Sequence, residues 1–393
     1  MAFSALKPIP EHEAIILIAE SDAMTLNLAK LKLNQLFFLS SVWRCSHPDC
    51  TAYPYSKGAI FCRLVQRPLW ILILILGVLN LLTVAWQCLL YLLVNDIELF
   101  VFPGERPSMF SNWSTHFVTP VRCHSHNDYW RRIPLQSALA AGCISVEADV
   151  WSWGDELLVG HSRYTVLPGT LHSLYLDPLL KILDDHNAPS RTWPRVKTHG
   201  IAGVFANDPM QTLTLLVDFK TDGDQIWPLL TERLQSFRDK GYLTYFNGTD
   251  IIYRPVTVVA NGDAPFNLIT KSSTYRDIFY DAPLDNLTLP ASPMGPTYNP
   301  SNSYYASADF RKSIGTLPLS RLSDDQLSTL RRQVRAAHDL GLKVRYWGNP
   351  TWPVGLRNYV WNMLVQEGVD VINTDDLRGT ARQDWTSHHW WKW

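Results

Sequence analysis

Short apolar runs alternate with longer amphipathic stretches from about residue 116 onward. Eight runs have the length and composition of buried strands: Phe117–Cys123, Ile144–Val150, Thr212–Lys220, Pro255–Ala260, Arg276–Asp281, Tyr304–Asp309, Leu342–Trp347 and Val369–Thr374. Helix-compatible stretches lie between several of them: Ile133–Ala141, Gln225–Lys240, Ser323–Leu340 and Leu356–Glu367. Gly341 and Gly368 directly follow two of these stretches, where glycine commonly ends a helix. This alternation predicts an α/β fold, a (β/α)8 barrel over residues 116–380, with the run Leu157–Val159 as an added arm.

A different pattern precedes the barrel. Leu69–Val94 contains no charged residue. Its roughly 26 residues, at about 1.5 Å each, cover the bilayer core of about 30 Å. Trp70 and Tyr91 lie near its two ends, where aromatic side chains meet the membrane interface. We therefore predict a single transmembrane helix over residues 68–95, in preference to a buried core helix, which rarely lacks a polar face over this length.

The charges beside this segment predict its orientation. Lys57, Arg63 and Arg67 precede it, whereas Asp96 and Glu98 follow it. The basic side stays in the cytosol, or in the matrix of a mitochondrion, so the barrel is expected in a lumen, outside the cell or in the intermembrane space. Three N-x-S/T sequons fall on the barrel side, as in a glycoprotein of the secretory lumen: Asn112, Asn247 and Asn286.

The remaining segments give weaker patterns. Residues 1–67 are expected to form a poorly structured leader, residues 96–115 a linker containing proline and glycine, and residues 381–393 an aromatic tail. The formal net charge of −1 gives no support to nucleic acid as a partner.

The six cysteines are scattered and show no C-x-x-C pair. Cys45, His47 and Cys50 lack a nearby fourth ligand, which disfavours zinc there. Cys123 and Cys143 end one predicted strand and precede the next, so they form either a disulfide or two ordinary buried thiols.

Acidic residues inside the predicted strands indicate a cation site. Glu147 and Asp149 are two positions apart on one strand, so their side chains share a face. Carboxylates that face a barrel interior repel each other unless a cation lies between them. Asp218 ends the next barrel strand, and Asn127 offers a neutral oxygen. These oxygens suit one divalent cation, Mg²⁺ or Ca²⁺, and acids within apolar strands are seldom merely solvated surface groups.

Two histidines follow neighbouring strands near these acids. His126 and His161 suit general acid and base catalysis, because an imidazole titrates near neutral pH. His124, two positions earlier, is a rival for the first of these roles. Lys220 could offer its charge to a phosphate, and Trp347 could line a substrate cleft. A surface lysine and a core tryptophan are the alternatives for these last two.

Several motifs resemble those of known phosphodiesterases. G-C-I-S-V-E-A-D-V-W with the following V-G-H-S resembles the catalytic core shared by phospholipase C-like phosphodiesterases. S-H-N-D-Y resembles the S-H-N-T-Y motif of phosphoinositide phospholipases C, and G-V-D-V-I-N-T-D-D-L resembles the last strand of glycerophosphodiester phosphodiesterases. The whole combination, over about residues 116–380, most resembles the fungal altered inheritance of mitochondria protein 6 family.

The resemblance implies a role for each matching residue. His126 and His161 match the two catalytic histidines, and the metal ligands are matched by Asn127, Glu147, Asp149 and Asp218. The H-R-G and E-N-T signatures of glycerophosphodiesterases are absent, and the third acid is Asp, as in the sphingomyelinase D enzymes of spider venom. The resemblance thus implies a membrane-anchored phosphoric diester hydrolase acting on a phospholipid or glycerophosphodiester.

Two other functions remain open at this stage. A membrane-anchored barrel without turnover could act as a scaffold in mitochondrial inheritance. The H-x-H sequence after the first strand, with Asp375 after the last, also fits a metal-dependent amidohydrolase. That enzyme class needs metal ligands after the middle strands, usually His or Lys. The middle strands here end in V-V-A-N-G-D and I-F-Y-D-A-P, without histidine.

Overall fold

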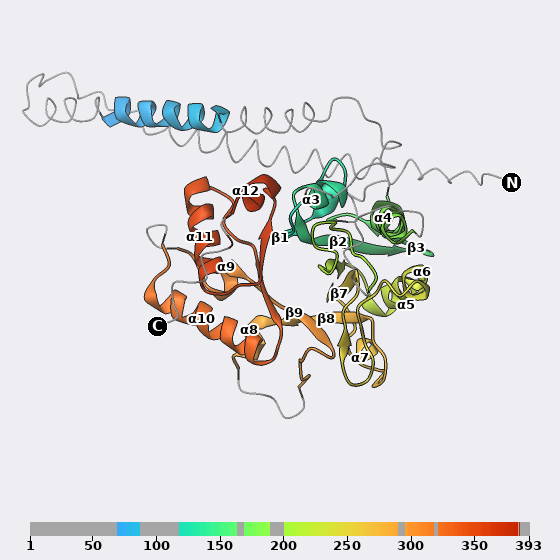
Figure 1. Ribbon diagram of the computed structural model, residues 1–393. Coiled ribbons are helices and arrows are strands. Elements are labelled where there is room, and N and C mark those ends of the chain that lie inside the picture. Colours follow the sequence, from blue (N-terminus) through green and yellow to red (C-terminus); the bar gives the residue numbers. More distant parts are fainter. Residues whose placement is uncertain are drawn as a thin grey trace, which may run out of the picture. The chain divides into compact units, whose positions relative to one another are not determined.

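The computed structural model describes residues 69–86, 118–162, 169–188, 200–289, 295–317, 321–383 and 385 (Figure 1). The chain divides into two compact units, Met1–Ser108 and Met109–Trp393. Each unit is described by itself.

The first unit contains one described helix, Leu69–Trp86. Its mean hydropathy is 2.4 and none of it is buried, so by length and composition it could cross a membrane. The rest of the predicted span, residues 68 and 87–95, lies outside the described residues, as do the predicted leader, the predicted linker and the sequon at Asn112.

The second unit is built on eight parallel strands. They are β1 Val121–Ser125, β2 Cys143–Trp153, β4 Leu213–Phe219, β7 Val256–Gly262, β8 Ile278–Pro283, β9 Ser303–Asp309, β10 Lys343–Trp347 and β11 Val371–Thr374. They neighbour one another in the order β1-β11-β10-β9-β8-β7-β4-β2, and β1 also pairs with β2, which closes the barrel. The predicted barrel is therefore confirmed. The predicted arm is β3 Glu156–Val159, antiparallel to β2.

Helices surround these strands (Figure 1). The longer ones are α4 Asp177–Asn187, α5 Gly223–Arg233, α10 Asp324–Asp339 and α11 Val354–Gln366. The short ones are η3 Asp128–Trp130, α3 Gln136–Ala140, η4 His172–Leu176, α6 Gln235–Asp239, α7 Phe266–Ile269, α8 Leu284–Leu287, α9 Phe310–Ser313 and α12 Leu377–Ala381. A hairpin, β5 Tyr245–Phe246 and β6 Ile251–Ile252, precedes β7. Ser323 caps α10 through a reciprocal capping box with Gln326, as a helix start requires.

Two helix predictions were partly wrong. Helix α3 covers only part of the predicted stretch Ile133–Ala141, because Leu135 has a φ of 63°, which interrupts a right-handed helix. The backbone N–H of Leu135 instead donates to the Asp128 carboxylate. The predicted single helix Gln225–Lys240 is two helices, α5 and α6, which meet at Leu234, where ψ is −1°.

Successive side chains along a strand point to opposite faces, so one face of β2 contacts the hydrophobic core and the other carries the acids. On β2, Val146, Ala148 and Val150 belong to the hydrophobic core. The residues between them, Glu147 and Asp149, therefore lie on the other face of the strand. A separate apolar cluster contains residues from several barrel strands: Leu216, Val259, Phe279, Tyr304, Tyr305 and Val371. Because Leu216 and Asp218 share one face of β4, the apolar cluster gives way to carboxylates toward the carboxyl end of the strands.

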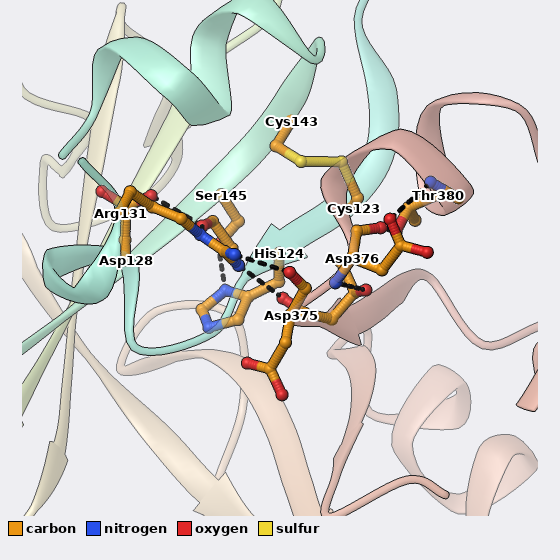
Figure 2. Close-up of a disulfide and its surroundings, with 12 residues drawn as sticks. Cys123, His124, Asp128, Arg131, Cys143, Ser145, Asp375, Asp376 and Thr380 are labelled. Atoms are coloured by element: carbon orange, nitrogen blue, oxygen red, sulfur yellow. Dashed lines mark hydrogen bonds between the residues drawn. A yellow bond between two sulfur atoms is a disulfide. The ribbon is translucent and has the colours of Figure 1, made fainter. Parts of the chain in front are cut away.

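A disulfide joins Cys123 on β1 to Cys143 at the start of β2 (Figure 2). Their Cα atoms are 4.7 Å apart and both residues are fully buried. Of the two possibilities that the sequence left open, the structure contains the disulfide.

We expect the Cys123→Ala/Cys143→Ala double variant to be less stable, because the disulfide closes a loop with a sequence separation of 20. For a loop of this size, chain-entropy arguments give a loss of about 3 kcal/mol in the free energy of unfolding. Urea titration followed by tryptophan fluorescence measures the difference. Recovery of both cysteines as free thiols from the unreduced wild-type protein would contradict the cross-link.

Candidate active site

The three acids predicted from the sequence lie together at the carboxyl end of the barrel. Asp149 on β2 is in register with Asp218 on β4, and Glu147 lies two residues earlier on β2. One carboxylate oxygen from each lies within 4.8 Å of the others. Glu147 and Asp149 are buried. Parallel strand register therefore forces three carboxylates into one water-poor space.

This crowding changes the protonation of the acids. Burial, together with the charges of Glu147 and Asp218, raises the pKa of Asp149 to about 7, although Lys220 opposes the shift. Burial also raises the pKa of Asp218 above its ordinary value. Lys220 Nζ lies 2.7 Å from Asp218 Oδ2 and 3.1 Å from Asp149 Oδ2. One ammonium group thus compensates part of the negative charge.

The cluster fits a divalent cation. Asp149 Oδ1 is buried and has no hydrogen-bond partner among the described residues. A buried carboxylate oxygen without a partner is costly, and a cation would satisfy it. The donor set is entirely oxygen, which suits Mg²⁺ or Ca²⁺.

His124 is fully buried and lies beside Ser145 (Figure 2). Its Nδ1 is 2.6 Å from Ser145 Oγ and its Nε2 is 3.3 Å from Glu147 Oε2. Burial, and then the charge of Arg345, lowers the pKa of His124 to about 4. The imidazole is therefore neutral at neutral pH. The tautomer that satisfies both partners donates from Nε2 to Glu147 and accepts from the Ser145 hydroxyl. His124, the rival for the first catalytic role, thus contacts Glu147 from a fully buried position, and its role stays a prediction.

Glu147 remains ionised because of its neighbours. Burial alone would raise the pKa of Glu147, but the hydrogen bond with His124 and the charges of Arg345 and His126 hold it well below its usual range. The backbone N–H of Asn127 also donates to Glu147 Oε2 at 3.2 Å. Asn127 has a φ of 45°, in the left-handed region that asparagine tolerates.

Arg345 on β10 is a buried cation that the sequence analysis missed. Its guanidinium donates to Asn373 Oδ1 at 2.8 Å and to Asp281 Oδ2 at 3.3 Å, and it approaches His124 Nε2 at 3.2 Å. With Asp281 included, four carboxylates in this region oppose two fixed cations, Arg345 and Lys220. When all six groups are ionised, two negative charges are left over, which matches the charge of one divalent cation.

His126 lies at the mouth of the barrel. Its Nδ1 is 2.9 Å from Asp375 Oδ1 and its Nε2 is 4.0 Å from Glu147 Oε2. Burial alone would lower the pKa of His126, but the hydrogen bond to Asp375 and the charges of Glu147 and Asp375 raise it above its ordinary value. Arg131 holds the same loop by donating to the backbone oxygens of Asp375 at 2.5 Å and of Thr374 at 3.2 Å (Figure 2). The first and last strands of the barrel are thus linked at His126.

His161 approaches the acids through Asp149. Its Nδ1 is 3.5 Å from Asp149 Oδ2, and its side chain is 55% exposed. Tyr129 Oη is 3.4 Å from the same nitrogen. The structure therefore places one predicted histidine beside Glu147 and the other beside Asp149.

The two predicted substrate-binding residues lie in different surroundings. Lys220 contacts the acids directly. Trp347 ends β10 and is 38% exposed, with Lys312 Nζ 5.8 Å from the centre of its ring. Trp347 is therefore not a core residue, and its role stays a prediction.

Three residues of this site were not singled out from the sequence: Tyr129, Arg131 and Arg345. Asp375 was placed after the last strand, but only as part of the amidohydrolase alternative. Tyr129 and Asp375 stand inside motifs that carried the resemblance, so their presence there was a usable signal. Arg345 interrupts the apolar run K-V-R-Y-W, as the acids interrupt V-E-A-D-V. The side chain of Arg131 gave no local signal for its link to the last strand, because Thr374 and Asp375 lie more than 240 positions away.

Comparison with known proteins gives matches along the barrel. The profile of the AIM6-like phosphodiesterase domain matches residues 113–281. The altered inheritance of mitochondria protein 6 homolog of Arthroderma benhamiae is 39% identical over 274 residues, which cover 67% of this chain and 83% of that protein. Altered inheritance of mitochondria protein 6 of Saccharomyces cerevisiae is 36% identical over 281 residues, covering 66% of this chain and 70% of that protein. The matched range of residues contains the three acids and both histidines.

A solved structure is also similar to this chain. The phosphatidylinositol-specific phospholipase C from Listeria monocytogenes covers 70% of this chain and 96% of its own, with 12% identity and a TM-score of 0.33. A score this low supports no argument about the site.

We expect Lys220→Met to bind a divalent cation more tightly than the wild-type protein, because the substitution removes a positive charge that competes for Asp149 and Asp218. Coulomb energies at this separation imply a gain of about tenfold in affinity. Terbium luminescence or calorimetric titration with Mg²⁺ and Ca²⁺ measures it. Lys240→Met, which breaks a surface pair with Asp184, is the matched control. Weaker binding in Lys220→Met would show that the lysine organises the acids.

Proposed function

The chain belongs to the altered inheritance of mitochondria protein 6 family, and from this premise we propose that it is a metal-dependent phosphoric diester hydrolase that cleaves a phospholipid or glycerophosphodiester. The observation that carries the proposal is the buried acid cluster with an imidazole on each side. His126 lies beside Glu147, and His161 lies beside Asp149. Acid and base groups next to a cation site suit phosphodiester cleavage, because they supply proton transfer and charge neutralisation.

The chain's own oxygens would hold the cation. Glu147, Asp149 and Asp218 supply carboxylates, and Asn127 supplies an amide oxygen. Asp149 Oδ1 is buried and has no hydrogen-bond partner among the described residues, so it is available to bind the cation. A divalent cation bound there would neutralise a non-bridging phosphate oxygen and lower the pKa of the attacking hydroxyl.

The two histidines divide the proton transfers. One imidazole takes the proton of the attacking water or substrate hydroxyl, and the other gives a proton to the leaving oxygen. His126 is held through Nδ1 by Asp375, which leaves Nε2 as its transfer atom. If a neighbouring substrate hydroxyl attacks, the first product is a cyclic phosphate.

Lys220 and Trp347 complete the proposed substrate site. Once a cation neutralises the acids, Lys220 is free to turn its ammonium group toward the phosphate. Trp347 and Lys312 present an aromatic face and a cation at the end of β10, where a headgroup would lie.

We propose that the enzyme is a single-pass membrane protein with the span at residues 68–95. Its N-terminus would lie in the cytosol or the matrix, and its barrel in a lumen, outside the cell or in the intermembrane space. The Cys123–Cys143 disulfide supports an oxidising compartment. The sequons at Asn247 and Asn286 are exposed, which suits N-glycosylation in a secretory lumen.

We expect the full chain in detergent to release headgroups from a panel of lysophospholipids, sphingomyelin and glycerophosphodiesters, with Mg²⁺ or Ca²⁺ but not with chelator. His126→Ala should reduce kcat by about 10²–10⁴, because it removes a proton-transfer group. Glu147→Ala should abolish the metal dependence. His338→Ala, at a surface pair with Asp370, is the control. A folded, cation-bound chain that cleaves nothing in the panel would favour the scaffold function instead.

We expect Asp375→Asn to move the pH profile. The carboxylate of Asp375 stabilises the protonated imidazole, so its removal lowers the pKa of His126. The limb of the kcat/KM profile that reports on His126 should shift to lower pH, by roughly one unit. Asp376→Asn is the matched control, because Asp376 pairs with Arg357. An unchanged profile in Asp375→Asn would contradict the pairing.

A further inference from the structure

The Tyr129 hydroxyl lies at the centre of the site, yet the proposed chemistry gives it no role. The residue is 1% exposed and follows Asn127 by two positions. Its Oη is 2.7 Å from Asn127 Oδ1 and 2.8 Å from Asp149 Oδ2. Its distance to His161 Nδ1 is 3.4 Å. One hydroxyl therefore contacts two proposed cation ligands and one proposed catalytic histidine.

The Tyr129 phenol can direct its proton in two ways. A phenol has one proton and can donate it fully to only one oxygen. Asn127 Oδ1 and Asp149 Oδ2 both lie at hydrogen-bonding distance from Tyr129 Oη, and both accept. Lys220 Nζ, 3.1 Å from Asp149 Oδ2, is a second donor to that carboxylate oxygen. With the lysine in this position, the phenol proton is available to Asn127 Oδ1.

A cation bound by Asn127 Oδ1 would take that acceptor from the phenol. The phenol proton would then be directed to Asp149 Oδ2, and a lone pair of Oη would be left to accept from His161 Nδ1–H. That hydrogen bond fixes the tautomer of His161, with the proton on Nδ1 and the lone pair of Nε2 available at the mouth of the barrel. The ring of Trp130, 5.2 Å from that of His161, borders the imidazole as well.

We propose that Tyr129 is a positioning residue that couples cation binding at the acid cluster to the tautomer and orientation of His161. This rests on the cation site and the role of His161 in the proposed function. Without the hydroxyl, His161 keeps only the longer contact to Asp149 Oδ2, at 3.5 Å. Its half-exposed ring would then sample other orientations whether or not a cation is bound.

The loop that carries Tyr129 is built to hold it in place. Asp128 is fully buried; it accepts from Ser125 Oγ at 2.6 Å and from the backbone N–H of Leu135. Ser125 and Leu135, which lie on either side of the turn, thus both donate to the Asp128 carboxylate. The position of the phenol is therefore set by the backbone, and removal of its oxygen alone tests the hydrogen bonds.

The test is ¹⁵N NMR of the full chain in detergent, labelled at histidine, with the His161 signals assigned by their loss in His161→Gln. In the wild-type protein, adding Mg²⁺ or Ca²⁺ should shift the His161 signals to those of the Nδ1–H tautomer. In Tyr129→Phe we expect this shift to be lost. Tyr346→Phe, which removes a buried hydroxyl that donates to Gln333 outside the site, should keep it.

Each other result overturns the coupling. A His161 shift in Tyr129→Phe equal to that of the wild type would show that Asp149 alone carries the effect. Loss of terbium binding in Tyr129→Phe would show that the hydroxyl serves the cation ligands rather than His161. A wild-type protein that binds no cation would remove the basis of the coupling. The NMR test needs no substrate. Failure to cleave the lipid panel would therefore contradict the proposed function without changing the NMR result on Tyr129.

Discussion

Repulsion among three carboxylates is the constraint on which the rest of the site depends. The register of β2 and β4 places Asp149 opposite Asp218, and the alternation of β2 adds Glu147 on the same face. Glu147 and Asp149 are buried, and Asp218 is only partly exposed. The protein relieves the repulsion with Lys220 above the cluster, with Arg345 and neutral His124 below it, and with a raised pKa at Asp149. A cation would complete that compensation.

Closure of the barrel forms the other half of the site. His126 and Asp375 are 249 positions apart in the chain, and they meet because β1 pairs with β11. Arg131 stabilises the same junction between β1 and β11 by donating to the backbone oxygens of Thr374 and Asp375 (Figure 2). The disulfide joins β1 to β2 on the other side of β1. The first strand is thus held to both neighbours, and His126 Nε2 lies 4.0 Å from Glu147 Oε2.

The sequence predicted most of the fold because the signals were local. Apolar runs bounded by polar residues located all eight strands, and acids two positions apart on β2 predicted a shared face. The features that the sequence did not predict depend on contacts with particular partner residues. Leu135 has a positive φ that its own residue type disfavours, and its N–H donates to Asp128. His124 and His126 are two positions apart, but β1 ends at Ser125, so only His124 lies on the strand, where it is buried, and His126 follows it at the mouth of the barrel. Arg345 finds its partners on β8 and β11, which no local pattern reveals.

The most direct test of the account is a crystal structure of the full chain grown with Mn²⁺, examined by anomalous scattering. We predict one strong peak within about 2.0–2.6 Å of an oxygen from each of Glu147, Asp149 and Asp218. Lys220 Nζ should have moved away from the two aspartates that it contacts now. Absence of a peak at the acids under saturating Mn²⁺, with Lys220 still between Asp149 and Asp218, would contradict the account. The lysine would then be the permanent counter-ion of the site.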